Sequence, residues 1–502
     1  MNVNSRNDRV ILERIAHQAM IERGLLPEFS PEALAEIEQL KILAEGETRP
    51  ADGPAPVRDL LDLPWASIDN DDSLDIDQLT AVEHMPDGNV RLYIAVADVV
   101  SLVAKGTAID EHARHNTTSV YTAARIFPML PEQLSTGLTS LNSGQERRAF
   151  VVEMVIAPDG SLQDSDIHQA LVINHAKLAY NSVAAWLDGS GKPPQAILAE
   201  TRLDENLRLQ DQIAQSMKNL RHLHGALTLE TIESKPLFDG NRLRTLQVEE
   251  KDRAKEIIEN FMVAANGVTA RFLSARKYPS IRRVVRTPRR WERIVAIAAE
   301  HNYRIPDSPD SRALEEFLVE QKAADPLRFP DLSLAVIKLL GAGEYIAELP
   351  DGQNPGHFGL AVKDYAHSTA PNRRYPDLLT QRLLKAAING QPVPYRKDEL
   401  DALAAHCTEA EDAATKVERR VEKSANALLL QSRIGEKFDS IVTGASGKGT
   451  WVRLLDVPVE GKLVLGFEGA DVGDRICVEL TAIDVQRGYI DFTKVAAAKC
   501  RR

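Results

Sequence analysis

The sequence has little cysteine and no long uninterrupted apolar run. Its 502 residues include only three cysteines, which lie far apart and form no CxxC pair. This spacing argues against a zinc site and is typical of a reducing compartment, so we expect a cytoplasmic location. The best candidate for a membrane span, residues 90–104, is interrupted by Arg91 and Asp98. It predicts a buried strand instead, and we expect no association with a membrane.

An excess of positive charge is also absent. The 73 acidic residues outnumber the 61 lysines and arginines and give a net charge of −12. A protein that coats nucleic acid with its whole surface carries the opposite sign, so any such binding needs a local basic channel. The most basic segment, residues 276–293 (RKYPSIRRVVRTPRRWER), predicts either such a groove or a solvated face that pairs with acidic neighbours.

The length of the chain and its changing pattern predict several units. At 502 residues the chain is too long for one hydrophobic core, and about two to four domains are expected. Residues 8–45 have helical spacing and precede a polar, Pro-containing linker at 45–56. Residues 60–165 are strand-rich, whereas helices are expected to dominate residues 190–300.

The C-terminal part of the chain has two further patterns. Residues 399–433 predict one long, charged helix. The tail, residues 435–495, contains five short strand-like runs separated by turn signals such as SGKG and DVG. Five strands in so short a segment are typical of an OB-type barrel. Trp451 in this tail either stacks on a ligand or fills the barrel.

The sharpest local signal is a cluster of aspartates in residues 65–80, WASIDNDDSLDIDQLT. Carboxylates so close in sequence repel one another, by ~4 kcal/mol for two charges 4 Å apart at an effective dielectric of about 20. A hard divalent cation relieves this repulsion, and Mg²⁺ prefers carboxylate oxygens. An EF-hand is excluded because its glycine and glutamate positions are Leu74 and Thr80, counted from Asp69. A solvated acidic turn remains the alternative.

Three ordered blocks of the sequence resemble the ribonuclease II / ribonuclease R (RNB) family. The family signature, T-I-D followed by D-x-D-D, is matched by Ser67-Ile68-Asp69 and by Asp75-Ile76-Asp77-Gln78. The second block is residues 119–142, SVYTAARIFPMLPEQLSTGLTSLN, and the third is residues 357–384, which contain the run STAPNRRYPD. The tail resembles the S1-type OB barrel that ends these enzymes. The resemblance covers residues 60–495.

The resemblance implies an α+β fold with four parts. These are a short helical N-terminal region and linker at 1–58, an RNB catalytic domain at 59–392, a connecting helix at 393–433 and an S1-type OB-fold RNA-binding barrel at 434–502. It implies a 3′→5′ exoribonuclease that uses Mg²⁺, or alternatively Mn²⁺, and releases nucleoside 5′-monophosphates from single-stranded RNA. We expect no small-molecule cofactor and a monomer.

The same resemblance assigns candidate roles by position. Asp69, Asp75, Asp77 and Arg373 match the catalytic residues, and the three aspartates also match metal ligands, with Gln78 and Asp72 as further candidate ligands. Arg373 would stabilise charge on the attacked phosphate. Tyr121 would stack on the 3′-terminal bases, with core packing as its alternative role. The remaining candidate RNA-binding residues are Glu418, Glu259, Arg374 and Trp451.

The chain departs from the family pattern at three places. Gln78 stands where the family usually has a fourth aspartate, which predicts weaker binding of a second metal ion. Leu229 stands where an aromatic partner for Tyr121 is expected, which predicts looser control of the final product length. The N-terminal region is too short for the paired cold-shock barrels of the family. An RNA-binding protein with an impaired nuclease site is therefore the alternative to an active enzyme.

Overall fold

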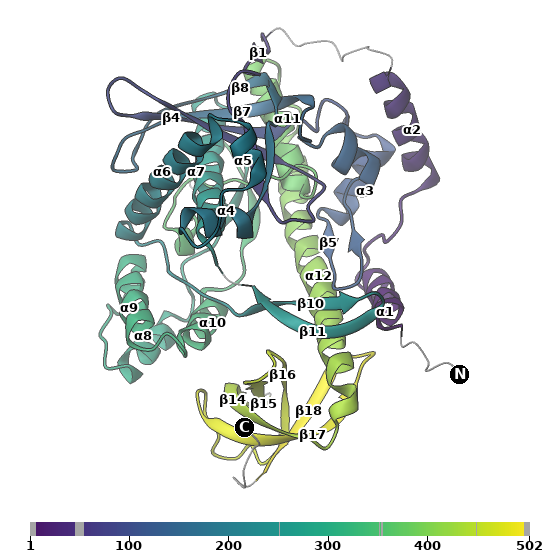
Figure 1. The fold of residues 1–502 in the computed structure, drawn as a ribbon, viewed down its shortest axis with the longest axis vertical. Helices are drawn as coiled ribbons and strands as arrows, with labels where there is room; N and C mark the ends of the chain where they lie inside the picture. Colours follow the sequence, from purple (N-terminus) through teal and green to yellow (C-terminus); the bar gives the residue numbers. More distant parts are fainter. Residues whose placement is uncertain are drawn as a thin grey trace.

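The largest element of the fold is a seven-stranded mixed sheet (Figure 1). The computed structural model describes residues 7–45, 55–249, 251–350, 352, 355–447 and 449–495. The strand order is β1-β8-β7-β4-β3-β2-β9, with parallel pairing only at the two edges, β1 with β8 and β2 with β9. The strands are β1 (Arg58–Asp59), β2 (Ala66–Asp69), β3 (Gln78–His84), β4 (Val90–Ala97), β7 (Glu146–Ile156), β8 (Leu162–Ile173) and β9 (Ala176–Ala179).

The centre of the sheet follows directly from the sequence. The apolar run of β4 is buried at every position but Arg91, as expected for a strand covered on both faces. The turn before it places Gly88 at a φ of +82°, which favours glycine. Residues of β3, β4 and β7 form one hydrophobic core with residues of two helices, α7 (Arg253–Ala275) and α11 (Tyr375–Ile388).

Helices surround this sheet. Asp252 caps α7 by accepting a hydrogen bond from the Lys255 amide at 2.8 Å, and Pro376 lies in the first turn of α11, where its missing N–H costs nothing. The helix α6 (Leu203–Leu223) packs on α7 and on β3. Two shorter helices, α4 (Tyr180–Leu187) and α5 (Gln195–Ala199), follow β9, and α3 (Ala108–Asn116) precedes the short strands β5 (Val120–Tyr121) and β6 (Ile126–Phe127).

The N-terminal region forms two helices, as its spacing predicts. The first, α1 (Asp8–Glu22), packs on α12 and on β11, while α2 (Pro31–Glu45) packs on α3 and on the π-helical turn η1 (Gln133–Leu138). The Leu243 amide donates a hydrogen bond of 3.0 Å to Asp8 Oδ2 and so joins α1 to the hairpin that follows α6. The N-terminal helices are therefore docked on the rest of the chain rather than detached from it.

Helices dominate residues 190–300, as expected, but the segment also contains strands that were not predicted. The structure adds an antiparallel hairpin, β10 (Glu233–Asp239) and β11 (Arg242–Glu249), and the strand β12 (Ser280–Val284), which pairs with β13 (Glu344–Glu348). The hairpin crosses the long helix α12 above the barrel (Figure 1). Three helices, α8 (Trp291–Glu300), α9 (Ser311–Ala324) and α10 (Phe329–Leu340), form a separate apolar cluster.

The long helix and the barrel predicted at the C-terminal end are both present. The helix α12 (Lys397–Leu430) has 34 residues, so it is about 51 Å long at 1.5 Å per residue. It connects the sheet to a closed five-stranded barrel (Figure 1). The barrel order is β14-β15-β16-β18-β17, from β14 (Lys437–Ser446), β15 (Gly449–Leu454), β16 (Glu460–Leu465), β17 (Arg475–Asp484) and β18 (Tyr489–Lys494). Within the described ranges, no helix is both long and apolar enough to cross a membrane.

Much of the basic segment 276–293 is paired with acidic residues. Arg282 is 2% exposed and lies against Glu348, Arg283 contacts Glu411, and Arg286 contacts Glu344. These three arginines fix β12 to β13 and to α12, which is the second of the two roles considered for the segment. Arg289, Arg290 and Arg293 remain exposed at the start of α8.

Candidate active site

The candidate site is built around Asp77, the residue before β3. Its side chain is 3% exposed, and its backbone carbonyl accepts a hydrogen bond of 3.0 Å from the Ala97 amide. The preceding loop is fixed by Ser140, whose hydroxyl accepts from the Ile76 amide at 2.9 Å and donates to the Leu74 carbonyl at 3.0 Å. The loop therefore delivers a carboxylate to a buried position at the end of the central sheet.

Arg373 reaches this carboxylate from a distant part of the chain. Its Nε lies 3.3 Å from Asp77 Oδ2, and the Asn372 amide donates to Asp77 Oδ1 at 3.1 Å. The Arg373 side chain stays 46% exposed, so it can still contact a ligand. The segment is held by the buried Asp377, which accepts from the Ala370 amide at 2.8 Å. The Asp77 carboxylate thus binds both the Asn372 amide and the Arg373 side chain.

Asp69 and Asp75 interact electrostatically with the Asp77–Arg373 pair. Burial raises the pKa of Asp77 to about 7, with the positive charge of Arg373 opposing the rise and the negative charge of Asp75 adding to it. Burial also raises the pKa of Asp75, and the charge of Asp69 adds to that rise. Although burial lowers the pKa of Arg373, the charges of all three aspartates act on it and its pKa is raised. The three predicted carboxylates are therefore all near enough to Arg373 to act on its charge, and Asp77 is in direct contact with it.

Tyr121 and Glu418 meet at the open side of the site. The Tyr121 amide donates a hydrogen bond of 2.8 Å to Glu418 Oε1, which anchors the tyrosine backbone to α12. Its side chain remains 42% exposed. Burial raises the pKa of Tyr121 to about 12, and the charge of Arg373 opposes that rise, which places the phenol next to the guanidinium. An exposed aromatic ring beside a cationic group can stack on a base.

Tyr180 is a site residue that the sequence analysis missed. β9 pairs in parallel with β2, and the register places Asp69 opposite Ala179. The next residue, Tyr180, begins α4 and is half-buried. Burial raises the pKa of its phenol and the charge of Asp69 adds to the rise, while Arg373 opposes it. The only sequence signal was a tyrosine at a strand-to-helix junction, which does not reveal its neighbours.

Two candidate residues, Arg374 and Glu259, form ion pairs with residues outside the site. Arg374 Nη2 lies 2.7 Å from Asp377 Oδ1, at the buried start of α11. Arg374 therefore faces the protein interior, although it is adjacent to Arg373. Glu259 on α7 is 3.5 Å from Arg221 Nη2 and is half-exposed. Neither contact involves Asp77 or Arg373.

Asp72, Leu229 and Trp451 lie in a groove, an apolar cluster and the barrel, respectively. Asp72 is exposed and lines a groove between the N-terminal helices and β5–β6 that contains none of Asp69, Asp75, Asp77 and Arg373. Leu229 packs in the apolar cluster of α8, α9 and α10. Trp451 is half-buried, and its inward neighbours in β15, Thr450 and Val452, fill the barrel instead.

The Gln78 side chain is directed at the arginine loop. Its amide nitrogen donates a hydrogen bond to the Thr369 carbonyl, three residues before Asn372. A carboxylate could not make this contact without a proton. The residue that replaces the family's fourth aspartate therefore has a structural partner on the segment that carries Arg373.

The carboxylate oxygens of the site suit a hard divalent cation, but they do not supply a complete coordination shell by themselves. Among the residues that the structure describes, no group of three or more His, Cys, Asp or Glu is close enough to hold a metal ion. Mg²⁺ commonly takes only one or two carboxylates and completes its shell with water and substrate phosphates. The buried Asp77, with its raised pKa, and the neighbouring Asp75 supply that number of carboxylates.

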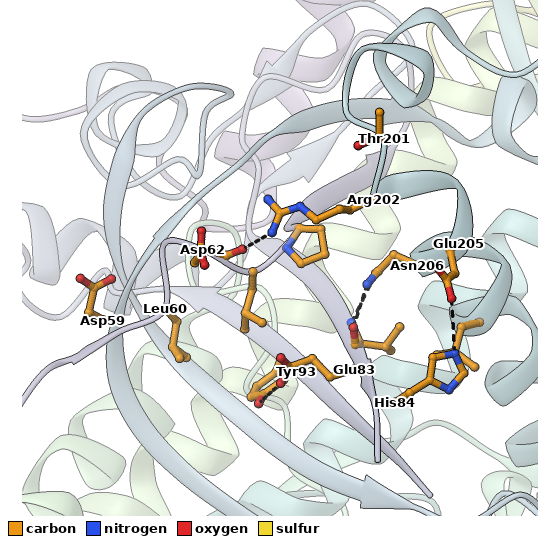
Figure 2. Close-up of a pocket in the computed structure, with 14 residues that line it drawn as sticks. Asp59, Leu60, Asp62, Glu83, His84, Tyr93, Thr201, Arg202, Glu205 and Asn206 are labelled. Carbon is orange, nitrogen blue, oxygen red and sulfur yellow. Dashed lines mark hydrogen bonds and ion pairs between the residues drawn. The ribbon is translucent and has the colours of Figure 1, made fainter. Parts of the chain in front are cut away.

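A separate pocket of about 540 Å³ opens beside β3 and α6 (Figure 2). Its lining includes Asp59, Asp62, Glu83 and Glu205, and Figure 2 shows Arg202 directed at Asp62 and His84 facing Glu205. The acidic lining is unfavourable for a polyanion. This pocket contains no residue of the Asp77–Arg373 site.

The chain combines a carboxylate–arginine site on a mixed sheet with a small closed barrel, and one long helix joins the sheet to the barrel. This is the architecture of a catalytic domain followed by an S1-type domain. The chain belongs to the RNB family: the RNB domain matches residues 57–390, and the RNase II-type exonuclease C-terminal S1 domain matches residues 436–495. This assignment confirms the family resemblance and the fold class expected from the sequence.

Known relatives extend beyond the length of this chain. Ribonuclease R of Escherichia coli is 29% identical over 91% of the chain, which spans 59% of that relative. Mycoplasma genitalium RNase R, solved with ribose-methylated single-stranded RNA, has a TM-score of 0.84 at 24% identity and covers 98% of this chain and 79% of its own. Yeast Ssd1, described as a pseudonuclease, has a TM-score of 0.68 at 15% identity, with 90% of this chain and 55% of its own covered. The fold is thus shared with a protein named RNase R and with one described as a pseudonuclease.

Proposed function

We propose that the chain is a metal-dependent exoribonuclease that hydrolyses single-stranded RNA from the 3′ end and releases nucleoside 5′-monophosphates. The observation that supports it best is the contact of Arg373 with Asp77, with Asp69, Asp75 and Tyr121 around them. The RNB family of exoribonucleases is metal-dependent. Mg²⁺ as the ion, with Mn²⁺ as the alternative, is part of the proposal, as are a monomeric state and a cytoplasmic location.

Each residue has a distinct task in this proposal. Asp77 and Asp75, with Asp69 beside them, would hold divalent ions, which when bound supply an activated water and stabilise charge on the phosphate. Arg373 is anchored by Asp77 and donates its remaining N–H groups to the non-bridging oxygens of the attacked phosphate. Tyr121 stacks on a terminal base and so fixes the position of the scissile bond.

The barrel would supply a further surface for the RNA strand. The Trp451 ring lies over Gly444 and Gly449, where a Cβ atom would lie 3.5 Å and 3.3 Å from its carbon atoms. The two glycines therefore let the ring lie flat on the barrel. Lys462 pairs with Trp451 across the neighbouring strand and adds a positive charge. An aromatic ring beside a lysine is typical of a sequence-tolerant contact with single-stranded RNA.

The alternative is an RNA-binding protein with an impaired nuclease site. Gln78 in place of an acidic residue favours it, and the fold also occurs in the pseudonuclease Ssd1. Purified protein is incubated with 5′-labelled poly(A) and Mg²⁺, with and without EDTA. Progressive shortening that EDTA abolishes supports the enzyme. Tight binding of the labelled strand without any shortening contradicts the proposed activity.

Tyr121→Ala is expected to weaken the binding of single-stranded RNA and to lengthen the final product. Loss of one base–aromatic stack costs about 1–3 kcal/mol, which corresponds to roughly a fivefold to 150-fold rise in Kd. The Tyr121 backbone is held by Glu418, so the substitution should not move the loop. Tyr121→Phe keeps the ring and serves as the control. Equal affinity and product length in the Ala and Phe variants would assign the ring to packing.

Gln78→Asp is expected to lower the hydrolysis rate about tenfold, because the loop that carries Arg373 loses a part-buried hydrogen bond. Loss of such a bond costs about 1–3 kcal/mol. The donor to the Thr369 carbonyl disappears, and a carboxylate replaces it. We expect the Mg²⁺ concentration for half-maximal rate to remain unchanged, which metal titrations of the two proteins would show. Gln78→Asn, which keeps the amide, is the matched variant. A clear fall in the metal requirement of Gln78→Asp would instead make residue 78 a ligand position.

A further inference from the structure

A second pocket, between α6 and α7, has a lining of the opposite charge to the acidic pocket. Its volume is about 310 Å³, and it is closed by the β7–β8 turn at Gly160 and by residues 362–364. Gly160 has a φ of +86°, and a Cβ there would lie 2.5 Å from the Ser216 backbone of α6. The β7–β8 turn therefore rests directly on α6. We call this hollow the α6–α7 pocket.

Three basic side chains at the α6–α7 pocket have no partner in the part of the chain that the structure describes. Arg271 on α7, Lys363 in the loop before Tyr365 and His224 at the end of α6 line the pocket without a side-chain ion pair or hydrogen bond. Burial lowers the pKa of Arg271, with Asp364 opposing this change and Arg282 adding to it. Arg271 and Lys363, both exposed, therefore place two positive charges at the pocket that have no ion-pair partner among the described residues.

The acidic groups near the α6–α7 pocket already have basic partners. Asp364 Oδ1 lies 3.7 Å from Arg282 Nη2, and Glu259 lies 3.5 Å from Arg221. Arg221 also lines the pocket, and Asn260 Oδ1 orients it by accepting from its Nη2 at 2.7 Å. The pocket therefore keeps a positive excess from Arg271 and Lys363 after these pairs are formed.

A small residue keeps the wall of the α6–α7 pocket open. A Cβ at Gly267 would lie 3.2 Å from Arg271 Nη1 and 3.5 Å from the Asp364 carbonyl oxygen. The glycine thus lets the guanidinium fold back over α7 toward the loop. The rest of the lining is mostly apolar, with Leu162, Met217 and Val263 as its main side chains.

We propose that the α6–α7 pocket binds one nucleotide unit, with the phosphate on Arg271 and Lys363 and the base on the apolar floor. Guanidinium and ammonium groups form charge-assisted hydrogen bonds with phosphate oxygens. The volume suits a single nucleotide, and an apolar floor with a few convergent polar groups is typical of a ligand site. The bound unit is either a free mononucleotide or one residue of an RNA strand. The inference does not depend on hydrolysis at Asp77.

The test is the binding of 5′-AMP in EDTA, measured by titration calorimetry on the full chain. Arg271→Gln/Lys363→Gln is expected to raise the Kd for AMP at least tenfold, because two charged donors are lost. Lys192→Gln/Lys338→Gln removes the same charge from exposed lysines elsewhere and should leave the Kd unchanged. Adenosine, which lacks the phosphate, should bind at least tenfold more weakly than AMP to the unmodified protein.

Several outcomes would overturn the α6–α7 pocket as a nucleotide site. They are equal AMP affinity in the pocket and control variants, adenosine binding as tight as AMP, and AMP binding that Arg373→Ala removes but the pocket variant keeps. Binding of a 5′-labelled oligo(A) in EDTA shows whether the nucleotide is free or part of a strand. If the pocket variant binds it more weakly, the unit belongs to a strand, whereas loss of AMP binding alone indicates a free nucleotide.

Discussion

Asp77→Asn is expected to lower the rate of RNA hydrolysis about a thousandfold while single-stranded RNA remains bound. The variant loses a charge that anchors Arg373 and that, in the proposed function, also holds the cation. Asparagine has nearly the same shape and can still accept from the Asn372 amide. Tyr121 and the barrel are not changed by the substitution. The loss should therefore fall on the chemical step and not on RNA affinity.

The same substitution should have the opposite effect on stability without metal. The pKa of Asp77 is about 7 in the folded protein and 3.8 in the reference state. The folded state therefore binds more protons between these values, so wild-type stability falls as pH rises from about 4 to about 7. Each tenfold change in proton affinity is worth ~1.4 kcal/mol. The free energy of unfolding of Asp77→Asn should therefore exceed that of the wild type by up to a few kcal/mol at pH 8 in EDTA.

Two measurements on Asp77→Asn test these effects separately. Single-turnover cleavage of labelled oligo(A) gives the rate, and thermal unfolding in EDTA at several pH values gives the stability. Asp72→Asn is the matched variant, because Asp72 is exposed in the same loop and lines a different groove. Wild-type cleavage by Asp77→Asn would remove Asp77 from the site. An equal loss in Asp72→Asn would make Asp72 a ligand despite its position.

The parts of the fold that the sequence could predict are those with a strong local pattern. The apolar run of β4, the spacing of α12 and the five short strands of the barrel each carry their own periodicity. The β10–β11 hairpin was missed although Asp239-Gly240 is a turn signal. Among its described side chains, it buries only Leu243 and Leu246 deeply, against other elements, so these strands show no complete apolar face of their own.

The site was predictable where a motif carried it and not where packing decided it. The aspartates and Arg373 are matched to family motifs, yet their contact joins residues about 300 positions apart and depends on the whole fold. Tyr180 enters the site only because β9 pairs in parallel with β2, a register that no local signal specifies. Arg373 and Arg374 are neighbours in one motif, but the helix start at Tyr375 turns the second inward to Asp377.

Arg373→Lys is expected to lower the hydrolysis rate about a hundredfold, with little change in the affinity for RNA. Lysine keeps the positive charge, but it lacks the planar fork that can bind Asp77 and a phosphate oxygen together. Removing one preorganised donor to the transition state commonly costs about a hundredfold or more in rate. The affinity for RNA should change little, because in the proposed function Tyr121 and the barrel also bind the strand and neither is altered.

The neighbouring Arg374 provides the matched comparison for this variant. Arg374→Lys should mainly reduce the free energy of unfolding, because the bond to the buried Asp377 is lost, and the folded fraction should cleave RNA at nearly the normal rate. Rates normalised to folded protein and melting temperatures of both variants separate the two roles. If Arg373→Lys cleaved at the wild-type rate while Arg374→Lys did not, the arginine that contacts the phosphate would be the buried one, and the contact with Asp77 would be structural only.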